Sequence, residues 1–221
     1  MENKKDLAEQ VYLSKVKELL GAVEKEVLYY DFRAYCKDGM LHSVNDLPAY
    51  EKYDKKENLH LQEWYCRGEL HRENDLPAEI HYFSDGRVMA QGYYAGGELH
   101  RVGNPAFEKY NENGTLEKQE WHCEGELHRD DDLPAVIVYY DNGVIAAKMY
   151  YDNDVLHRSS GPAHEQFNEK GELELEEWYF QGELHRVNGA PAVIWYGEKG
   201  TVLEELFYVN GVHVATTVTK K

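Results

Sequence analysis

A fixed internal period is the feature that most limits how this chain can fold. A histidine recurs in one phase at intervals of 29, 29, 28, 29, 28 and 28 residues, at His42, His71, His100, His128, His157, His185 and His213. Every proline belongs to the same unit and is followed by alanine: Pro48, Pro77, Pro105, Pro134, Pro162 and Pro191. Repeats of this length stack and grow as arrays, so the chain length does not set the number of domains.

The spacing inside each repeat predicts a β-hairpin. Nine residues after the proline a glycine closes a turn, as in Asp85-Gly86 and Asn113-Gly114. Such dipeptides between alternating strands indicate hairpins in which both turn residues take positive φ. We place the proline at the first residue of a strand, where its missing N–H does least harm. The return strand then ends on an aromatic residue, such as Trp64 or Tyr93.

A second, longer period divides the repeats into two classes. Trp64, Trp121 and Trp178 are 57 residues apart, and each follows a glutamate. The intervening repeats carry Tyr93, Tyr150 and Phe207 in the same place. The pattern predicts a structural unit of two hairpins. Alternate repeats either face different surroundings, or the array grew by duplication of pairs.

The two ends of the chain differ from the repeats. Val16, Leu19, Leu20, Val23 and Val27 fall at helical spacing, so residues 2–27 are predicted to form an amphipathic helix. We favour a cap on the first repeat for this helix, with a partner-binding helix as the alternative. The domains expected are a helical cap at 1–27, the repeat array at 28–213, and a terminal strand with a basic tail at 214–221.

The fold expected from these patterns is all-β: an elongated array of about six to seven antiparallel β-hairpin repeats with an N-terminal helical cap. The repeats are 28–29 residues long and are paired into a unit of 57 residues. A closed propeller is the alternative, but two-stranded repeats fit its four-stranded blades poorly.

Two segments carry a resemblance to a known family. They run from Trp64 to Gly68 and from Trp178 to Gly182, and each leads into Leu-His-Arg. Residues 28–213 resemble the MORN-type repeat, a stacked β-hairpin unit rich in Tyr, Trp and Gly. They are most similar to a longer variant, with a downstream Pro-Ala, found in bacterial, phage and large-virus proteins, some of them labelled antitoxins. The resemblance implies a twisted β-sheet and an interaction role rather than a chemistry.

The charge of the chain bears on its partners. Forty-one acidic and 24 basic residues give a net charge of −17. Such a field repels nucleic-acid backbones and anionic membranes, and it attracts basic proteins. No apolar run approaches membrane-spanning length, and three cysteines, an odd number, point to a reducing compartment. We therefore expect a cytoplasmic protein with a basic protein partner, without direct binding to nucleic acid or membrane.

The repeated His-Arg and His-Ser pairs suggest a ladder of metal sites, but geometry argues against it. Equivalent histidines lie about 9–10 Å apart if each repeat adds two strands. Zinc needs its nitrogen ligands about 2 Å away, so neighbouring rungs cannot share an ion. We expect the pairs to hold the variable loop instead, by bonding its carbonyls or pairing with Asp46, Asp75 and Asp132. The residues concerned are His71, Arg72, His100, Arg101, His128, Arg129, His157, Arg158, His185 and Arg186.

The residues outside the repeat pattern give no catalytic constellation. His60, His81, His122 and His164 fall at different phases, without an obvious nucleophile or carboxylate pair. Cys36, Cys66 and Cys123 belong to different repeats and are interpreted as packed small hydrophobic residues. The sequence predicts no catalytic, cofactor-binding or metal-binding residue, no cofactor, and no enzyme. A hydrolytic active site formed by one of the loops is a further alternative, and it would need an asymmetric polar pocket.

The return strands offer the candidate binding surface. Their glutamates and aromatic residues could form a solvated face, or a face where rings anchor and carboxylates steer a basic protein. The candidates are Trp64, Glu63, Trp121, Glu120, Trp178, Glu177, Glu174 and Glu176. The leading hypothesis is a non-enzymatic protein-binding scaffold that acts as an inhibitor or antitoxin-like neutraliser of a basic partner. The alternative is an acidic nucleic-acid mimic, which predicts rows of carboxylates along one edge. A third hypothesis is a membrane-associated MORN-like module, which the negative net charge disfavours.

Overall fold

The computed structural model describes residues 25–29 and 31–219, and its described part consists of β-strands and turns. The all-β array of antiparallel hairpins is confirmed. The predicted helix at 2–27 falls mainly on residues 1–24, which lie outside the described residues, and residues 25–27 belong to a strand. The chain folds as two units, residues 1–98 and 99–221.

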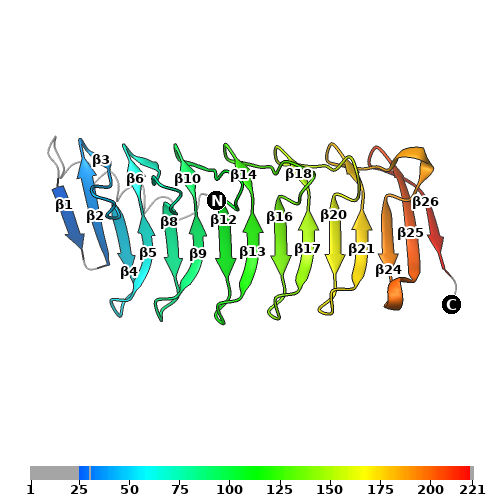
Figure 1. The fold of residues 1–221 in the computed structure, drawn as a ribbon, viewed down its shortest axis with the longest axis horizontal. Coiled ribbons are helices and arrows are strands. Elements are labelled where there is room, and N and C mark those ends of the chain that lie inside the picture. The colour runs from blue at the N-terminus through cyan, green and yellow to red at the C-terminus, as the bar shows by residue number, and fades with distance from the viewer. Residues whose placement is uncertain (1–24, 30, 220–221) are drawn as a thin grey trace, which may run out of the picture. The chain divides into compact units, whose positions relative to one another are not determined.

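In the first unit, long strands lie side by side in chain order, each antiparallel to the next (Figure 1). They are β1 (Lys25–Tyr29), β2 (Phe32–Lys37), β4 (Tyr50–Tyr53), β5 (Leu59–Glu63), β8 (Glu79–Tyr82) and β9 (Val88–Gly92). Two-residue strands follow the long hairpins: β3 (Met40–Leu41), β6 (Tyr65–Cys66), β7 (Glu69–Leu70), β10 (Tyr94–Ala95) and, at the end of this unit, β11 (Glu98–Leu99).

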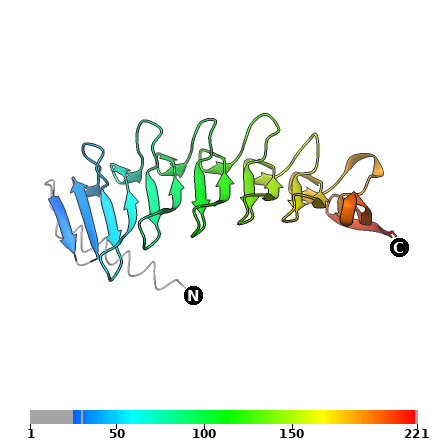
Figure 2. The same cartoon turned by 60° about the horizontal axis from the view of Figure 1, so that its bottom comes forward.

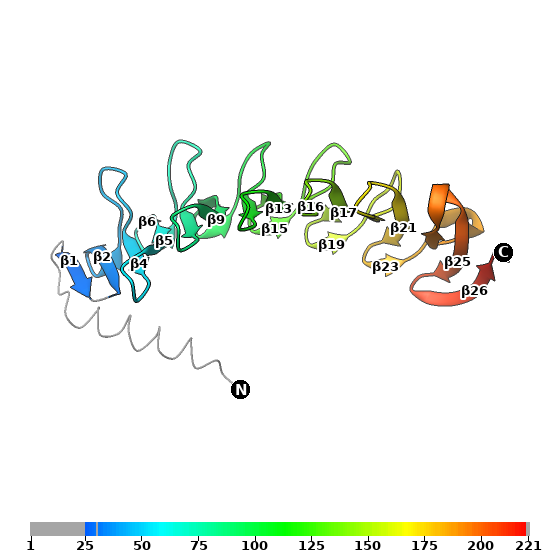
Figure 3. The ribbon, with the colours of Figure 1, turned by 90° about the horizontal axis from the view of Figure 1, so that it is seen from below.

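The second unit repeats this plan. Its long strands are β12 (Phe107–Tyr110), β13 (Leu116–Glu120), β16 (Val136–Tyr139), β17 (Ile145–Met149), β20 (His164–Phe167), β21 (Leu173–Glu177), β24 (Val193–Tyr196), β25 (Val202–Val209) and β26 (Val212–Val218). Its short hairpins pair β14 (His122–Cys123) with β15 (Glu126–Leu127), β18 (Tyr151–Asp152) with β19 (Val155–Leu156), and β22 (Tyr179–Phe180) with β23 (Glu183–Leu184). Two 3-10 turns, Val187–Gly189 and Glu198–Gly200, complete it. Figure 3 shows β15, β19 and β23 in a row.

The turns of the long hairpins differ from the prediction, except that Lys199 and Gly200 take φ of +60° and +72°. Gly86 takes a φ of +84°, but Asp85 is not among the residues with positive φ. The N–H of Gly86 donates to the carbonyl of Phe83, and the N–H of Phe83 donates to the carbonyl of Arg87. This is a three-residue loop in which only the last residue is left-handed, and a β-bulge accompanies it between His81 and Tyr82.

The predicted two-residue turns occur at the short hairpins instead. Arg67 and Gly68 take φ of +52° and +88°, as do Glu124 and Gly125 with +50° and +84°. Asp154 replaces the glycine in one repeat and still takes a φ of +62°, because aspartate tolerates this region better than most residues. Each of these short hairpins therefore has a tight two-residue turn and directly follows a long hairpin in the chain.

Backbone hydrogen bonds of one alanine per repeat tie neighbouring hairpins together. The N–H of Ala78 donates to the carbonyl of Gly92 in its own hairpin, and its carbonyl accepts the N–H of Trp64 from the preceding hairpin. The strand begins at Glu79, two residues after Pro77, so the proline precedes the strand rather than opening it. Six such alanines are at most 1% exposed: Ala49, Ala78, Ala106, Ala135, Ala163 and Ala192.

The last strand departs from the repeat. Ala215 lies opposite Phe207 in the register of β25 and β26, but only Val214 separates it from His213. The loop present in the other repeats is missing, so β26 runs straight from Val212 to Val218 and all its residues are exposed. The predicted terminal strand therefore starts two residues earlier than expected.

The cysteines are divided between core and surface. Cys36 is buried on β2, and burial raises the pKa of its thiol. Cys66 and Cys123 are exposed, which corrects their interpretation as packed residues. Both end the first strand of a short hairpin, where the turn leaves the side chain in solvent.

Candidate interaction surface

An arginine holds the loop that follows each short hairpin except β2–β3, where serine follows the histidine, and this arrangement is called the clasp. The guanidinium carbon of Arg72 lies 3.8 Å from the ring centre of Trp64, and its Nη1 donates to the carbonyl of Pro77 at 3.2 Å. Its Nε and Nη2 donate to the two carboxylate oxygens of Asp46 at 2.8 and 2.9 Å. One planar side chain therefore stacks on a ring, holds its own loop and binds the loop of the preceding repeat.

The clasp recurs with little change. Arg129 lies over Trp121, Arg158 over Tyr150 and Arg186 over Trp178, at 3.8, 3.8 and 3.6 Å. Their Nη1 atoms donate to the carbonyls of Pro134, Pro162 and Pro191 at 3.2, 3.3 and 3.2 Å, and Arg101 donates to Pro105 at 3.3 Å. Arg158 also donates to Asp132 at 3.0 Å. These hydrogen bonds lower the pKa of the Asp46 and Asp132 carboxyls.

Three of the histidines beside these arginines accept a backbone hydrogen bond from the next repeat. The N–H of Gln181 donates to Nδ1 of His157 at 3.3 Å, and the N–H of Glu124 donates to Nδ1 of His100 at 3.2 Å. A backbone N–H can only donate, so Nδ1 is the acceptor in both bonds. His42 and His185 accept in the same way from Arg67 and Asn210. Three His-Arg pairs, those that begin at His100, His157 and His185, thus make both the loop and the turn contact.

The tryptophans proposed as partner anchors lie inside the repeats. Trp64 is 4% exposed and Trp121 is 7% exposed, each beneath its arginine, and Trp178 is half-buried. Nε1 of Trp64 donates to the carbonyl of Asp46 at 3.0 Å. Rings covered in this way offer a partner little surface.

The glutamates next to them are half-buried and have partners. Glu63 accepts the hydroxyl of Tyr65 at 3.0 Å, and Glu177 lies 2.7 Å from Nδ1 of His164. Glu120 is bonded by His122, which holds the pKa of its carboxyl below the usual value. Burial alone would lower the pKa of His122, but Glu120 and the Gly125 carbonyl outweigh it and raise that pKa.

The two remaining candidates lie on β21. Glu176 accepts the hydroxyl of Tyr196 at 2.6 Å and is half-buried, as is Glu174. The two side chains are one strand period apart and lie on one face of the sheet. Four of the five candidate glutamates thus bond to neighbours within the sheet rather than form a free acidic face.

The exposed acidic residues lie elsewhere, in the turns and loops. Residues 99–219 contain 22 acidic and nine basic residues, a net charge of −13, against −5 for residues 31–98. In 99–219 only Lys170 and Lys199 are exposed basic residues, whereas thirteen acidic ones are exposed. These are Glu112, Glu124, Glu126, Asp130, Asp131, Asp132, Asp141, Asp152, Asp154, Glu169, Glu172, Glu183 and Glu198. The run Asp130-Asp131-Asp132 could have indicated them from sequence.

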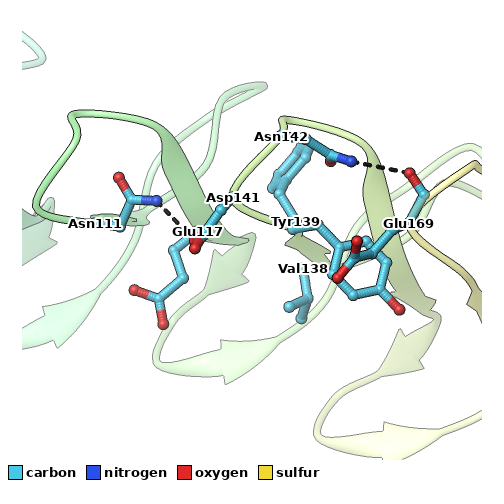
Figure 4. A pocket seen from close by; sticks show the side chains of 8 residues that line it. Asn111, Glu117, Val138, Tyr139, Asp141, Asn142 and Glu169 are labelled. Atoms are coloured by element: carbon cyan, nitrogen blue, oxygen red, sulfur yellow. Dashed lines mark hydrogen bonds between the residues drawn. The ribbon is translucent and has the colours of Figure 1, made fainter.

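A hollow of about 560 Å³ opens among these turns in the second unit (Figure 4). The side chains of Tyr139, Glu117 and Asp141 line it. Asn111 donates from Nδ2 to Asp141 at 2.9 Å, and Asn142 donates to the carbonyl of Glu169 at 2.9 Å. The hollow is therefore formed by hydrogen bonds between successive turns.

The loops held by the arginines stand away from the sheet in the repeats of each unit (Figure 2). They carry exposed aliphatic side chains: Leu47, Leu76, Val102, Leu133 and Val187. In the second unit the loop of Leu133 also carries Asp130, Asp131 and Asp132. Acidic and apolar groups thus share one projecting loop.

No model of a known protein family matches this chain, and no curated protein matches it either. Within residues 25–29 and 31–219, no group of three or more His, Cys, Asp or Glu side chains could hold a metal ion. The same residues include no helix that is long and apolar enough to cross a membrane.

Proposed function

We propose that the chain is a non-enzymatic, protein-binding repeat scaffold that acts in the cytoplasm as an inhibitor or antitoxin-like neutraliser of a basic protein. The observation that carries the proposal is the charge of the exposed side chains in residues 99–219, where thirteen are acidic and two are basic. Such a surface accelerates association with a cationic partner and suppresses binding to anionic ones.

The arrangement of the exposed carboxylates supports a rigid template. The short hairpins that carry Glu124, Glu126 and Glu183 are joined to their neighbours through backbone bonds, such as the N–H of Gly182 to the carbonyl of Leu156 at 3.0 Å. Glu124 and Glu126 flank Gly125 in a tight turn. A backbone held in this way loses little freedom when a partner binds its side chains, which favours affinity.

An affinity capture from the lysate of the native host tests the proposal. The immobilised chain is washed with stepwise increasing salt, and the eluted proteins are identified by mass spectrometry. One basic protein that is released at moderate salt is the expected result, because screening weakens attraction between exposed charges. The absence of any specific partner from a competent lysate would contradict the proposal.

A second candidate function is an acidic nucleic-acid mimic that blocks a DNA- or RNA-binding enzyme. Exposed carboxylates on three successive short hairpins, at Glu126, Asp154 and Glu183, favour it, since a mimic must present negative charges at regular intervals. It predicts that the captured protein binds DNA or RNA and that added nucleic acid displaces it. Salt should weaken that competition, because counterion release drives nucleic-acid binding. A captured partner that added nucleic acid does not displace supports the first function instead.

A further inference from the structure

The outermost strand of the second unit, β26, has an open edge (Figure 1). It pairs with β25 on one side, and among the described residues no strand pairs with it on the other. The N–H of Thr219 donates to the carbonyl of Leu203, in line with β25, at 2.9 Å. Residues of an antiparallel strand direct their backbone groups to alternate sides, so Thr217 also faces β25. The N–H and C=O groups of Thr216 and Val218 therefore point to the open edge.

This edge lacks most of the features that usually prevent sheet edges from pairing. Natural edge strands are short, or they carry charged side chains or proline. β26 has seven residues, and none of them is acidic, lysine, arginine or proline. Val212, Val214 and Val218 are 64, 57 and 62% exposed. A bulge interrupts the pairing with β25 next to Tyr208, but the run from Ala215 to Val218 keeps a regular register. That run is an open template for another strand.

The charge of this segment differs from that of the rest of the chain. Residues 206–221 contain no acidic residue and include Lys220 and Lys221, whereas the whole chain has a net charge of −17. Two copies of so acidic a chain repel each other, but this segment adds nothing to that repulsion. β26 itself also offers no carboxylate that would attract a strand of a basic protein. The charges therefore favour a second copy of the chain as the occupant of this edge.

Antiparallel pairing of two β26 strands would bring opposite charges together. The end of each strand would pass the start of the other, so the lysines that follow Val218 in the sequence would approach the turn at Gly211. The exposed Glu183 lies beside that turn, because a Cβ atom on Gly211 would be 3.8 Å from the Cβ of Glu183. A two-fold axis repeats this contact, so each copy provides both the basic and the acidic group. The same symmetry covers both open edges and ends the assembly at a dimer.

We propose that the open edge of β26 binds the same edge of a second copy, so that two chains form a two-fold symmetric dimer with antiparallel strands at the contact. The backbone groups of Thr216 and Val218 make the hydrogen bonds between the copies. This dimer is independent of the function proposed above, because it uses the edge of β26 and leaves the acidic turns of the second unit free for a partner.

Sedimentation velocity of the full chain, from micromolar to near-millimolar concentration, tests the proposal. The wild type should shift from the mass of one chain to twice that mass. Thr216→Pro should keep the single mass, because proline removes an N–H that points to the open edge and is tolerated there. Val218→Lys, at an exposed position, should do the same by placing a charge at the contact. A wild type of single mass throughout, or undiminished dimerisation in either variant, would overturn the proposal.

Thr217→Pro is the matched control. Its N–H faces β25, so this substitution should lower Tm, whereas Thr216→Pro should leave Tm near the wild-type value. Equal losses of Tm in the two variants would contradict the assignment of the open backbone groups.

Hydrogen exchange locates the contact. The amides of Thr216 and Val218 should exchange more slowly as the concentration of the wild type rises, while the rate at Thr217 stays the same. A dimer in which these two amides stay unprotected would be formed by another surface and would overturn the proposal. A wild type that stays single, but binds the captured partner more tightly than Thr216→Pro does, would overturn it as well and assign the edge to a strand of that partner.

Discussion

The ring of Tyr94 occupies the space where Gly92 has no side chain: a Cβ atom on Gly92 would lie 2.6 Å from its Cε2. From there the hydroxyl of Tyr94 donates to Glu79 at 2.8 Å, on the strand that pairs with Gly92. Burial, and then the charge of Glu79, raises the pKa of Tyr94. Position 92 therefore requires glycine because the ring of Tyr94 lies across the strand at that point.

Gly92→Ala should therefore destabilise the first unit by about 1–3 kcal/mol, the usual cost of forcing extra volume into a packed site. Urea denaturation measures the loss. In a Tyr94→Leu background the ring is gone, and the same substitution should cost less than about 0.5 kcal/mol. An equal cost in both backgrounds would show that the ring does not set the requirement for glycine.

Arg158→Lys should destabilise the second unit by about 1–2 kcal/mol, because lysine cannot stack on Tyr150 while bonding both Pro162 and Asp132. The matched control is Arg87→Lys, since Arg87 is half-exposed and its contacts, with Asp85 and with the ring of Phe83 at 5.7 Å, both lie within its own turn. The control should cost less than about 0.5 kcal/mol. Equal shifts of the denaturation midpoint would contradict the role given to the clasp.

His157→Asn should preserve the link to the next repeat, whereas His157→Leu should break it. An asparagine oxygen can lie near the position of Nδ1 and accept the N–H of Gln181, but leucine cannot accept a hydrogen bond. Hydrogen exchange of the Gln181 amide measures the difference. It should speed up in the leucine variant and stay near the wild-type rate in the asparagine variant. Fast exchange in both would mean that the bond does not protect this amide.

Stability should fall as the pH rises above about 10. Burial foremost raises the pKa of tyrosines in both units: Tyr53, Tyr65, Tyr82, Tyr94, Tyr139, Tyr150, Tyr179 and Tyr196. The pKa of Tyr150 rises to about 12. Because the unfolded chain ionises first, the stabilisation is complete below pH 10 and is lost as the pH rises through the folded pKa values.

Phenolate absorbance and circular dichroism, recorded together from pH 8 to 13, check the alkaline transition. The two signals should change together, since buried phenols ionise as the sheet unfolds. Tyrosines that ionise near pH 10 with an unchanged sheet would contradict the packing described for these hydroxyls.

The repeat and the order of its strands could be predicted from the sequence. Histidines such as His71 and prolines such as Pro77 recur at a fixed period because each repeat must reproduce the same backbone geometry. The prediction placed the two-residue turns in the wrong hairpins. Gly86 ends the turn of a long hairpin and Gly68 that of a short one, and residue identity alone does not say which turn has two left-handed residues. The short hairpins escaped detection since two-residue strands such as Tyr65–Cys66 show no alternation.

The candidate site was less predictable than the fold. The exposure of Trp64 depends on Arg72, whose guanidinium reaches the ring only after the chain has turned back through a short hairpin. The partners of Glu177 likewise come from a facing strand, through His164. Local patterns indicate strands, whereas these contacts join residues on separate strands and loops.

The most direct test of the scaffold account compares two variants of equal net charge for affinity to the captured partner. Glu124→Gln/Glu126→Gln/Asp131→Asn/Glu183→Gln removes four exposed carboxylates from the second unit, and Asp38→Asn/Glu57→Gln/Glu69→Gln/Glu98→Gln removes four from the first. The account predicts at least about a tenfold loss of affinity for the second-unit variant and little change for the first-unit variant, because contact charges act locally at physiological salt. Equal losses in both variants, or none in either, would contradict a binding surface built on the acidic turns of the second unit.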